Sequence, residues 1–241
     1  MKKLSITIDG QSIPFKQGQS IIEAAQQAGV YIPHLCYQTG FKPQGSCKVC
    51  NVEVDGHIHS ACTTQACDGQ VIKNNTEQQN SARKAITQML FIEGNHLCPS
   101  CEKSGHCDLQ ALGYHLKMYD LHFPHFFPNR EIDSSHPDIM LDRNRCIFCE
   151  LCVRASRDND AKNIFSIGGR GINSELIINS PSGTLADSGL DINDRAARIC
   201  PVGAIIIKGE SFETPIGERR YDQHSIADTY VNKLEDQSNE R

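Results

Sequence analysis

The spacing of the cysteines constrains this chain more than any other feature of its sequence. Twelve cysteines occur among 241 residues, and within most of their groups the neighbours are separated by only a few positions. Two cysteines three positions apart are poorly placed to bridge each other but well placed to bind one metal ion or cluster. The pattern therefore predicts metal binding rather than a disulfide framework. The cysteines are Cys36, Cys47, Cys50, Cys62 and Cys67, then Cys98, Cys101 and Cys107, then Cys146, Cys149 and Cys152, and finally Cys200.

The composition is that of a folded protein in a reducing compartment. The chain is 39% apolar and 22% charged, with a formal net charge of -5, so we expect no nucleic-acid partner. No apolar run approaches the roughly 18 residues of a membrane-spanning helix, and the two lysines at the start precede no apolar segment. We therefore expect a cytoplasmic protein without a membrane span, in which so many thiols bind metal.

The first part of the chain predicts a β-grasp, ferredoxin-like domain. Apolar and polar residues alternate around two tight turns, Asp9-Gly10 and Asp55-Gly56, which predicts two β-hairpins. Between them, Ser20 and Glu23 form a capping box that predicts a helix over residues 20–29. Two hairpins around one helix are typical of the β-grasp fold.

The remainder predicts smaller elements around the later cysteines. An apolar stripe predicts a helix over residues 81–92. Residues 111–141 lack periodicity and predict an irregular linker, whose histidines we expect to pack or face solvent rather than bind metal. The polar tail is expected either to fray or to lie on a partner protein. The predicted fold class is α+β, in four parts: a β-grasp, ferredoxin-like domain (1–78), a small domain around the middle cysteines (79–118), a bacterial-ferredoxin-like domain around the third cysteine group (119–215) and a C-terminal tail (216–241).

The first constellation comprises Cys36, Cys47, Cys50 and Cys62. Plant-type 2Fe-2S sites use C-x4-C-x2-C with a distant fourth cysteine, and this arrangement is a variant with a longer first gap. The alternative is zinc, but zinc sites usually pair two C-x2-C knuckles and only one occurs here. We favour a 2Fe-2S cluster with Cys62 as the fourth ligand, because Cys62 ends the second hairpin. Cys67 would then be a spare thiol.

The segment "CIFCELC" is the most specific signal in the chain. Bacterial ferredoxins use C-x2-C-x2-C-x3-C-P, but Ser156 stands here in the place of the fourth cysteine. The downstream match is Cys200, which proline follows. We therefore predict that Cys146, Cys149, Cys152 and Cys200 hold one 4Fe-4S cluster. Four arginines flank this group and could either offset its negative charge or belong to a solvated face or to salt bridges with a partner: Arg143, Arg145, Arg154 and Arg157.

The middle group, Cys98, Cys101 and Cys107, leaves a four-coordinate site one ligand short. Once the two outer groups and these three residues are assigned, Cys67 is the cysteine that remains for that position. A histidine is the other candidate, since imidazole replaces thiolate in Rieske centres. His96 precedes Cys98 by two residues, whereas His106 adjoins Cys107, and neighbouring residues seldom both reach one metal. From spacing alone these candidates stay open.

The order of these segments resembles an electron-transfer region shared by three groups of oxidoreductases. A β-grasp module, "HLCPSCEKSGHCDLQ", "RCIFCELCVRASRD" and "ICPVGAI" follow one another over about residues 1–210. This order is similar to that in the large iron-sulfur subunit of respiratory NADH dehydrogenase, in the N-terminal part of FeFe hydrogenases and in the diaphorase small subunit of NAD-reducing NiFe hydrogenases. The resemblance implies a 4Fe-4S cluster on His96, Cys98, Cys101 and Cys107. One residue separates His96 from Cys98, where the family more often has three.

Among these relatives we favour the hydrogenase subunit. We expect a chain of 241 residues to have no room for a hydrogen-activating domain, and "GLDINDRAARICPVGAI" and "ETPIGERRYDQ" look like the stand-alone subunit. The resemblance then implies a subunit of a hydrogen:NAD+ oxidoreductase with one 2Fe-2S and two 4Fe-4S clusters. It would relay electrons between a flavin- and NAD-binding diaphorase subunit and the small and large hydrogenase subunits.

We expect no substrate active site in this chain itself. The glycine-rich segment "GGRG" at 168–171 is not a dinucleotide-binding motif, so FMN and NAD are expected on the partner subunit. Two alternatives are the equivalent subunit of an NAD-dependent formate dehydrogenase or of a respiratory NADH dehydrogenase-type complex. A third, from another class, is a zinc-stabilised scaffold protein without redox function.

Overall fold

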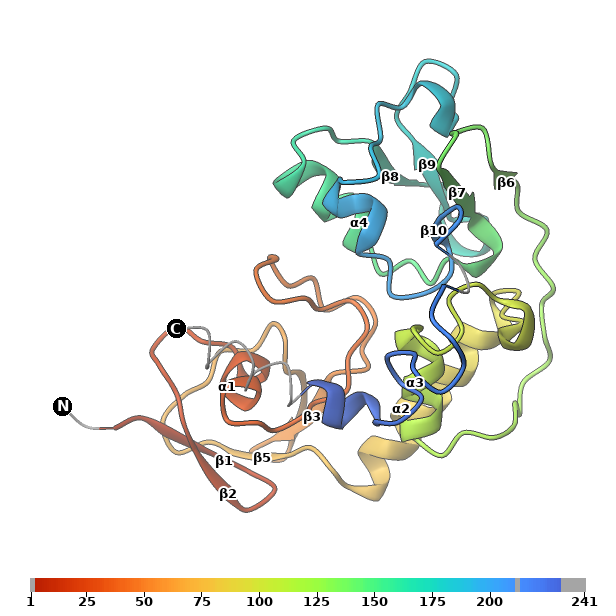
Figure 1. Ribbon diagram of the computed structural model, residues 1–241. Helices are drawn as coiled ribbons and strands as arrows, with labels where there is room; N and C mark the ends of the chain where they lie inside the picture. The colour runs from red at the N-terminus through yellow and green to blue at the C-terminus, as the bar shows by residue number, and fades with distance from the viewer. Residues whose placement is uncertain (1–2, 211–212, 231–241) are drawn as a thin grey trace. The chain divides into compact units, whose positions relative to one another are not determined.

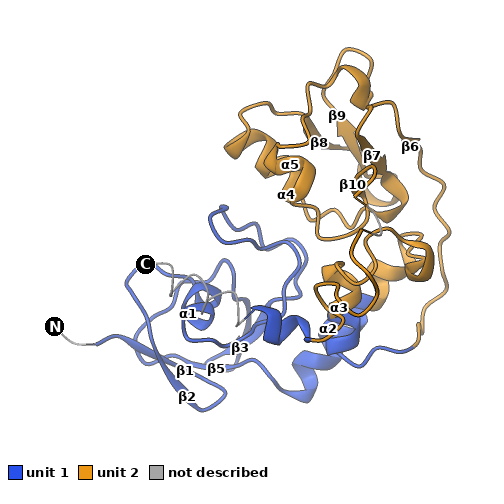
Figure 2. Ribbon diagram, in the orientation of Figure 1, with its two compact units in different colours: residues 1–87, 112–119, 224–241 blue, residues 88–111, 120–223 orange. Residues whose placement is uncertain are grey.

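The structure, a computed structural model, describes residues 3–210 and 213–230 and divides into two compact units (Figure 1, Figure 2). Unit 1 comprises residues 1–87, 112–119 and 224–241, and unit 2 comprises residues 88–111 and 120–223. The chain therefore leaves unit 1 and returns to it twice. Both units are assembled from segments that lie far apart in the sequence.

Unit 1 contains a five-stranded mixed sheet with the strand order β2-β1-β5-β3-β4. Both predicted hairpins are confirmed, and all four residues of their turns, Asp9-Gly10 and Asp55-Gly56, have positive φ, as type I′ turns require. β5, which was not predicted, pairs parallel with β1 and antiparallel with β3. The strands are β1 (Ser5–Ile8), β2 (Gln11–Pro14), β3 (Asn51–Val54), β4 (His57–Ser60) and β5 (Val71–Lys73).

The predicted first helix is confirmed as α1 (Ile21–Gln27). Its capping box is formed: the Glu23 amide donates to Ser20 Oγ at 3.4 Å, and the Ser20 amide donates to Glu23 Oε2 at 2.7 Å. The apolar side of α1 is buried against the strands in the core of unit 1. The two hairpins and this helix together form the predicted β-grasp arrangement.

Unit 2 contains a three-stranded antiparallel sheet, order β10-β7-β6, and a separate antiparallel pair, β8 and β9. The segment after Cys200 forms β10 (Ile205–Ile207). The other elements are β6 (Ile132–Asp133), β7 (Ile139–Asp142), β8 (Phe165–Gly168), β9 (Glu175–Ile178), α4 (Leu151–Arg154) with a following π-helical turn (Ala155–Asn159), and α5 (Arg195–Arg198).

Two further helices cross the boundaries between the units. The helix predicted over residues 81–92 is confirmed as α2 (Glu77–Ile92), with an earlier start. The prediction of an irregular linker over residues 111–141 is wrong in part, because α3 (Asp108–His115), β6 and β7 occupy some of it. The apolar spacing of α3 begins at the fully buried Leu109, before residue 111. A predicted linker that starts at residue 111 therefore divides this helix.

Part of the C-terminal tail is ordered on the chain itself. Residues 217–222, which we call the C-terminal strap, hydrogen-bond to the loop of residues 104–108 in unit 2. The prediction of a frayed or partner-bound tail is therefore wrong for this segment. The last part of the predicted tail, 231–241, lies outside the described residues.

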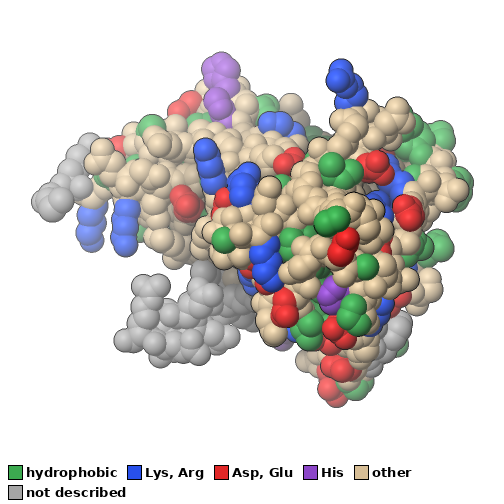
Figure 3. Space-filling model, turned by 90° about the horizontal axis from the view of Figure 1, so that it is seen from above, with side chains coloured by type: hydrophobic (Ala, Val, Ile, Leu, Met, Phe, Trp, Pro, Cys, Tyr) green, Lys and Arg blue, Asp and Glu red, His purple; other side chains and the backbone are tan. Residues whose placement is uncertain are grey.

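Lys and Arg side chains are interspersed with Asp and Glu on the face of the molecule that Figure 3 shows. The whole chain has a formal net charge of -5, which agrees with this mixed distribution. Within residues 3–210 and 213–230, no helix combines the length and the apolar content that a membrane span needs.

Candidate cluster sites

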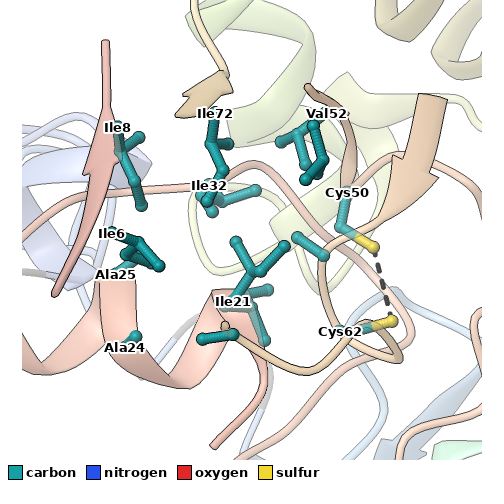
Figure 4. Close-up of a cluster of buried hydrophobic side chains, with 14 of the residues drawn as sticks. Ile6, Ile8, Ile21, Ala24, Ala25, Ile32, Cys50, Val52, Cys62 and Ile72 are labelled. Carbon is teal, nitrogen blue, oxygen red and sulfur yellow. Dashed lines mark hydrogen bonds between the residues drawn. The ribbon is translucent and has the colours of Figure 1, made fainter. Parts of the chain in front are cut away.

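The first cysteine constellation lies in unit 1, where it adjoins the apolar core. Cys50 immediately precedes β3 and Cys62 follows β4, so the second hairpin brings their thiols together, with 3.4 Å between the two Sγ atoms (Figure 4). Both side chains are buried. The thiol of Cys47 hydrogen-bonds to that of Cys36, which is also buried. The four residues predicted as ligands thus form two thiol pairs.

These thiols interact with one another electrostatically. The hydrogen bond from Cys47 lowers the pKa of Cys36 to about 5, and the hydrogen bond from Cys50 lowers the pKa of Cys62. Cys36 and Cys47 also act electrostatically on Cys62. Each pair therefore favours one thiolate, the form of cysteine that binds metal.

Cys67, the alternative fourth ligand, has a different environment. Its side chain is exposed, and its amide donates to Gln70 Oε1 at 2.9 Å in the turn before β5. Cys62, rather than Cys67, shares a buried contact with another cysteine of this group.

Arg83, on α2, fixes the backbone around Cys50. It is only 2% exposed, and it donates to the carbonyl oxygens of Val49 at 3.0 Å and of Asn51 at 2.9 Å. A third bond, 2.8 Å long, goes to the carbonyl oxygen of Asn74. No sequence pattern pointed to this role, since an arginine on an amphipathic helix is normally solvated.

The cysteine loops contain strained backbone. Lys48, Phe148 and Glu150 adopt left-handed φ values of 58°, 53° and 56°. Such conformations cost about 1–3 kcal/mol for residues other than glycine and cluster at functional sites. The amide of Phe148 lies 3.5 Å from Cys146 Sγ, and hydrogen bonds of this kind tune iron-sulfur clusters.

The third constellation is assembled in unit 2. Cys146, Cys149, Cys152 and Cys200 line one small, mainly apolar cavity. The first three belong to the loop before α4 and to its first turn, whereas Cys200 follows α5. Burial raises the pKa of Cys146 to about 12 and raises the pKa of Cys152 well above its usual value. The fold thus brings the distant fourth cysteine to the short motif.

Ser156 stands where two-cluster ferredoxins have their fourth cysteine. It is fully buried, and its Oγ accepts a 2.7 Å hydrogen bond from the amide of Ile164. This position therefore has a structural role in the present chain.

The four flanking arginines lie in different environments. Arg157 is exposed and forms an ion pair with Asp158, which is the surface alternative. Arg143 and Arg154 are buried; Arg154 donates to the carbonyl oxygen of Cys149 at 3.1 Å. Arg145 contacts a sulfur atom of the middle group.

The middle constellation forms a second cavity in unit 2. Its lining includes His96 together with Cys98, Cys101 and Cys107. Cys98 begins a short 3-10 turn (Cys98–Ser100), and Cys107 directly precedes α3. The fold therefore gathers one imidazole and three thiols around a common space.

The imidazole of His96 has the properties of a metal ligand. Its Nε2 is buried and has no hydrogen-bond partner among the described residues, and the backbone of Leu90 also interacts with the ring. Burial, with a smaller contribution from Arg145, lowers the pKa of His96 to about 4, so the ring is neutral at pH 7. Neutral imidazole is the form that binds metal.

The other histidine candidate is engaged elsewhere. His106 Nδ1 accepts a hydrogen bond from the amide of Arg220 in the C-terminal strap, at 3.4 Å. It lines an outer groove with Lys103 and Arg198. Among the three candidates that spacing left open, the geometry favours His96.

The histidines of the predicted linker have other partners. His115 packs edge-on against Tyr31, and the ring of His125 lies 4.2 Å from that of Phe127. His136 Nε2 lies 2.9 Å from the carbonyl oxygen of Leu190. In the described ranges, no three His, Cys, Asp or Glu side chains are arranged to hold a single metal ion.

Three protein-family models match consecutive parts of the chain. A 2Fe-2S iron-sulfur cluster binding domain matches residues 1–77. The NADH-ubiquinone oxidoreductase-G iron-sulfur binding region matches residues 83–122, and a 4Fe-4S single cluster domain matches residues 139–207. Iron-sulfur clusters, not zinc, are thus the groups common to the matching families.

Curated relatives extend this similarity over most of the chain. The gamma subunit of the NAD-reducing hydrogenase HoxS from Cupriavidus necator is 41% identical, over 92% of this chain and 95% of the relative. The alpha subunit of an NADPH-Fe(3+) oxidoreductase from Geobacter sulfurreducens is 32% identical, over 87% of this chain but only 24% of the relative. The mitochondrial 78 kDa subunit of NADH-ubiquinone oxidoreductase from Candida albicans is 30% identical, over 88% of this chain and 29% of the relative.

A solved structure matches nearly the whole fold. The matching chain comes from the crystal structure of an NAD+-reducing NiFe hydrogenase in the H2-reduced state. The TM-score is 0.92 and the sequence identity is 48%. The match covers 96% of this chain and 98% of the chain in that structure.

Proposed function

The chain belongs to the family of the gamma subunit of NAD-reducing hydrogenase, and on that premise we propose which residues hold its iron-sulfur clusters and between which partners it relays electrons. It is an iron-sulfur subunit of an oxidoreductase, with one 2Fe-2S domain and 4Fe-4S binding regions. The proposed ligands are Cys36, Cys47, Cys50 and Cys62 for the 2Fe-2S cluster, His96, Cys98, Cys101 and Cys107 for the middle 4Fe-4S cluster, and Cys146, Cys149, Cys152 and Cys200 for the third cluster.

The donor chemistry of each site supports these assignments. The 2Fe-2S ligands are thiols held in buried pairs, and the third site gathers four thiols in an apolar cavity. When bound, each cluster would accept and release a single electron. The chain contributes ligands, excludes water from them and places N-H groups and buried cations beside them. Arg83 and Arg154 supply such cations at loops that carry cysteines.

The partners follow from the relatives rather than from contacts within this chain. We propose a flavin- and NAD-binding diaphorase subunit on one side and the small and large hydrogenase subunits on the other. The sequence has no dinucleotide-binding motif of its own. We also propose a cytoplasmic location, and the parts 1–78, 79–118, 119–215 and 216–241; the family models match residues 1–77, 83–122 and 139–207.

One competing assignment is the equivalent subunit of a formate dehydrogenase or of a respiratory complex. The hydrogenase relative matches over 95% of its length, whereas the chain matches only 29% of the mitochondrial respiratory subunit from Candida albicans. This difference favours the hydrogenase. Isolation of the complex, followed by NAD+ reduction with hydrogen or with formate as the electron donor, distinguishes a hydrogenase from a formate dehydrogenase.

The buried, unpartnered Nε2 of His96 in a cavity with three thiols is the observation that carries the ligand assignment. In the intact complex purified without oxygen, we expect iron and acid-labile sulfide for one 2Fe-2S and two 4Fe-4S clusters. His96→Cys replaces a neutral ligand by an anionic one and should lower the midpoint potential of one 4Fe-4S cluster. Cys67→Ser should change nothing. An unchanged redox spectrum in His96→Cys, or a cluster lost in Cys67→Ser, would contradict the assignment.

A further inference from the structure

Arg145 belongs in sequence to one cysteine group but contacts the other. It directly precedes Cys146, the first cysteine of the third group. Its Nη1 nevertheless lies 3.7 Å from Sγ of Cys101, in the middle group, and 3.4 Å from the carbonyl oxygen of Gly203. A single guanidinium therefore stands between a sulfur of one site and the loop that follows Cys200 of the other.

Two carboxylates fix the orientation of this guanidinium. Nη1 donates to Glu102 Oε2 at 2.5 Å, and Nε donates to Asp142 Oδ2 at 2.9 Å. The Arg145 side chain is 17% exposed and that of Asp142 only 7%. Oδ1 of Asp142 also accepts from the amide of Asn144 at 3.0 Å, so the acidic partner is itself held in place. The planar guanidinium of Arg145, held by these fixed partners, keeps its orientation with little further loss of side-chain entropy.

The charge of Arg145 acts on the middle site more directly than that of any other arginine near the third group. A cluster becomes more negative when it gains an electron, and a fixed cation close to a ligating sulfur stabilises that form. Glu102 and Asp142 act in the opposite direction by offsetting part of the cationic charge. The charges of these three side chains together can therefore set how readily a cluster bound by Cys101 accepts an electron.

We propose that Arg145 is a positioning residue that raises the redox potential of the middle cluster and, through Glu102, holds that potential at an intermediate value. The inference rests on the proposed ligands of this cluster. Arg145 ligates nothing itself. It acts through the sulfur of Cys101, and the carbonyl contact to Gly203 ties its position to the loop of the third site.

The test is a redox titration of the intact complex, followed by electron paramagnetic resonance of the two 4Fe-4S clusters. Arg145→Met should shift the midpoint of the middle cluster to lower potential, with a smaller shift at the third. Arg145→Lys, which keeps the charge but not the fork, should restore part of the difference. Glu102→Gln, which leaves the cation less compensated, should shift the midpoint in the opposite direction.

A matched control separates this effect from a general change of charge. Arg157→Met removes the same charge from an exposed ion pair and should leave the middle cluster unchanged. A wild-type midpoint in Arg145→Met would overturn the proposal; where Arg145→Met fails to assemble, a wild-type midpoint in Glu102→Gln would do so. A failure of the ligand assignment is seen separately, as an unchanged redox spectrum in His96→Cys or a cluster lost in Cys67→Ser.

Discussion

Gly203 and Cys101 lie so close together that only a glycine fits between the two cysteine groups. A Cβ built on Gly203 would lie 2.7 Å from Cys101 Sγ and 3.3 Å from Cβ of Lys103. Next to this contact, the amide of Asp108 donates to the carbonyl oxygen of Pro201 at 2.8 Å. The loop that follows Cys200 is therefore packed directly on the loop that carries the middle cysteines.

This contact predicts that Gly203→Ala damages the middle cluster more than the third, although Gly203 belongs to the motif of the third. Overpacking costs about 1–3 kcal/mol, and the atom in the way is a ligand sulfur. We expect a lower yield of the middle cluster, or an altered spectrum. Gly209→Ala is the control: its positive φ makes alanine strained, but a Cβ there meets nothing within 4 Å. Equal spectra for Gly203→Ala and Gly209→Ala would contradict the prediction.

Gly94 has a similar relationship to His96. A Cβ on Gly94 would lie 2.5 Å from His96 Nε2 and 2.9 Å from the carbonyl oxygen of Asn144. The backbone cannot yield, because the amide of Asn95 donates to that same carbonyl oxygen at 2.8 Å. Gly94→Ala should therefore displace the imidazole and change the spectrum and potential of the middle cluster alone. Glu93→Ala, at the exposed neighbouring position, should behave as wild type, and a wild-type middle cluster in Gly94→Ala would refute the role of His96.

Elements specified by nearby residues were predictable from the sequence. The Asp-Gly turns, the capping box of Ser20 with Glu23, and the stripe of α2 are all local, and each led to the observed element. β5 was missed because it is three residues long and acquires its identity from pairing with β1 and β3. The short-range spacing of the cysteines likewise carries most of the information about the cluster sites.

The remaining parts of the sites depend on contacts between distant segments. Spacing could not separate His96 from His106, since only the fold shows that one ring nitrogen is buried without a partner while the other ring bonds to the strap. The contacts of Arg83 and Arg145 at the cluster sites could not be predicted from the sequence for the same reason. Several of their acceptors lie far away in the sequence and are backbone carbonyls, which any residue type can supply.

The role of Arg83 predicts that its loss destabilises the 2Fe-2S domain. Arg83→Met leaves the carbonyl oxygens of Val49, Asn51 and Asn74 without this donor, and each buried unsatisfied group costs about 1–3 kcal/mol. The temperature at which the visible absorbance of the 2Fe-2S cluster is lost should fall by several degrees. Lys84→Met, one residue along α2, removes only one exposed hydrogen bond and should have little effect. Similar transitions in the two variants would show that Arg83 has no such role.

The C-terminal strap predicts a kinetic effect on the middle cluster. Tyr221 donates from its hydroxyl to Asp108 Oδ1 at 2.6 Å and from its amide to the carbonyl oxygen of Gly105 at 2.9 Å, so it covers the loop between Cys101 and Cys107. Tyr221→Phe removes a hydrogen bond to a charged group, worth about 1.5–3 kcal/mol, and should speed local opening roughly tenfold or more. The measurement is the rate of iron release to a chelator without oxygen, with Tyr119→Phe, whose side chain is exposed, as the control. Release from the third cluster should not change, and equal rates for Tyr221→Phe and wild type at the middle cluster would show that the strap does not protect it.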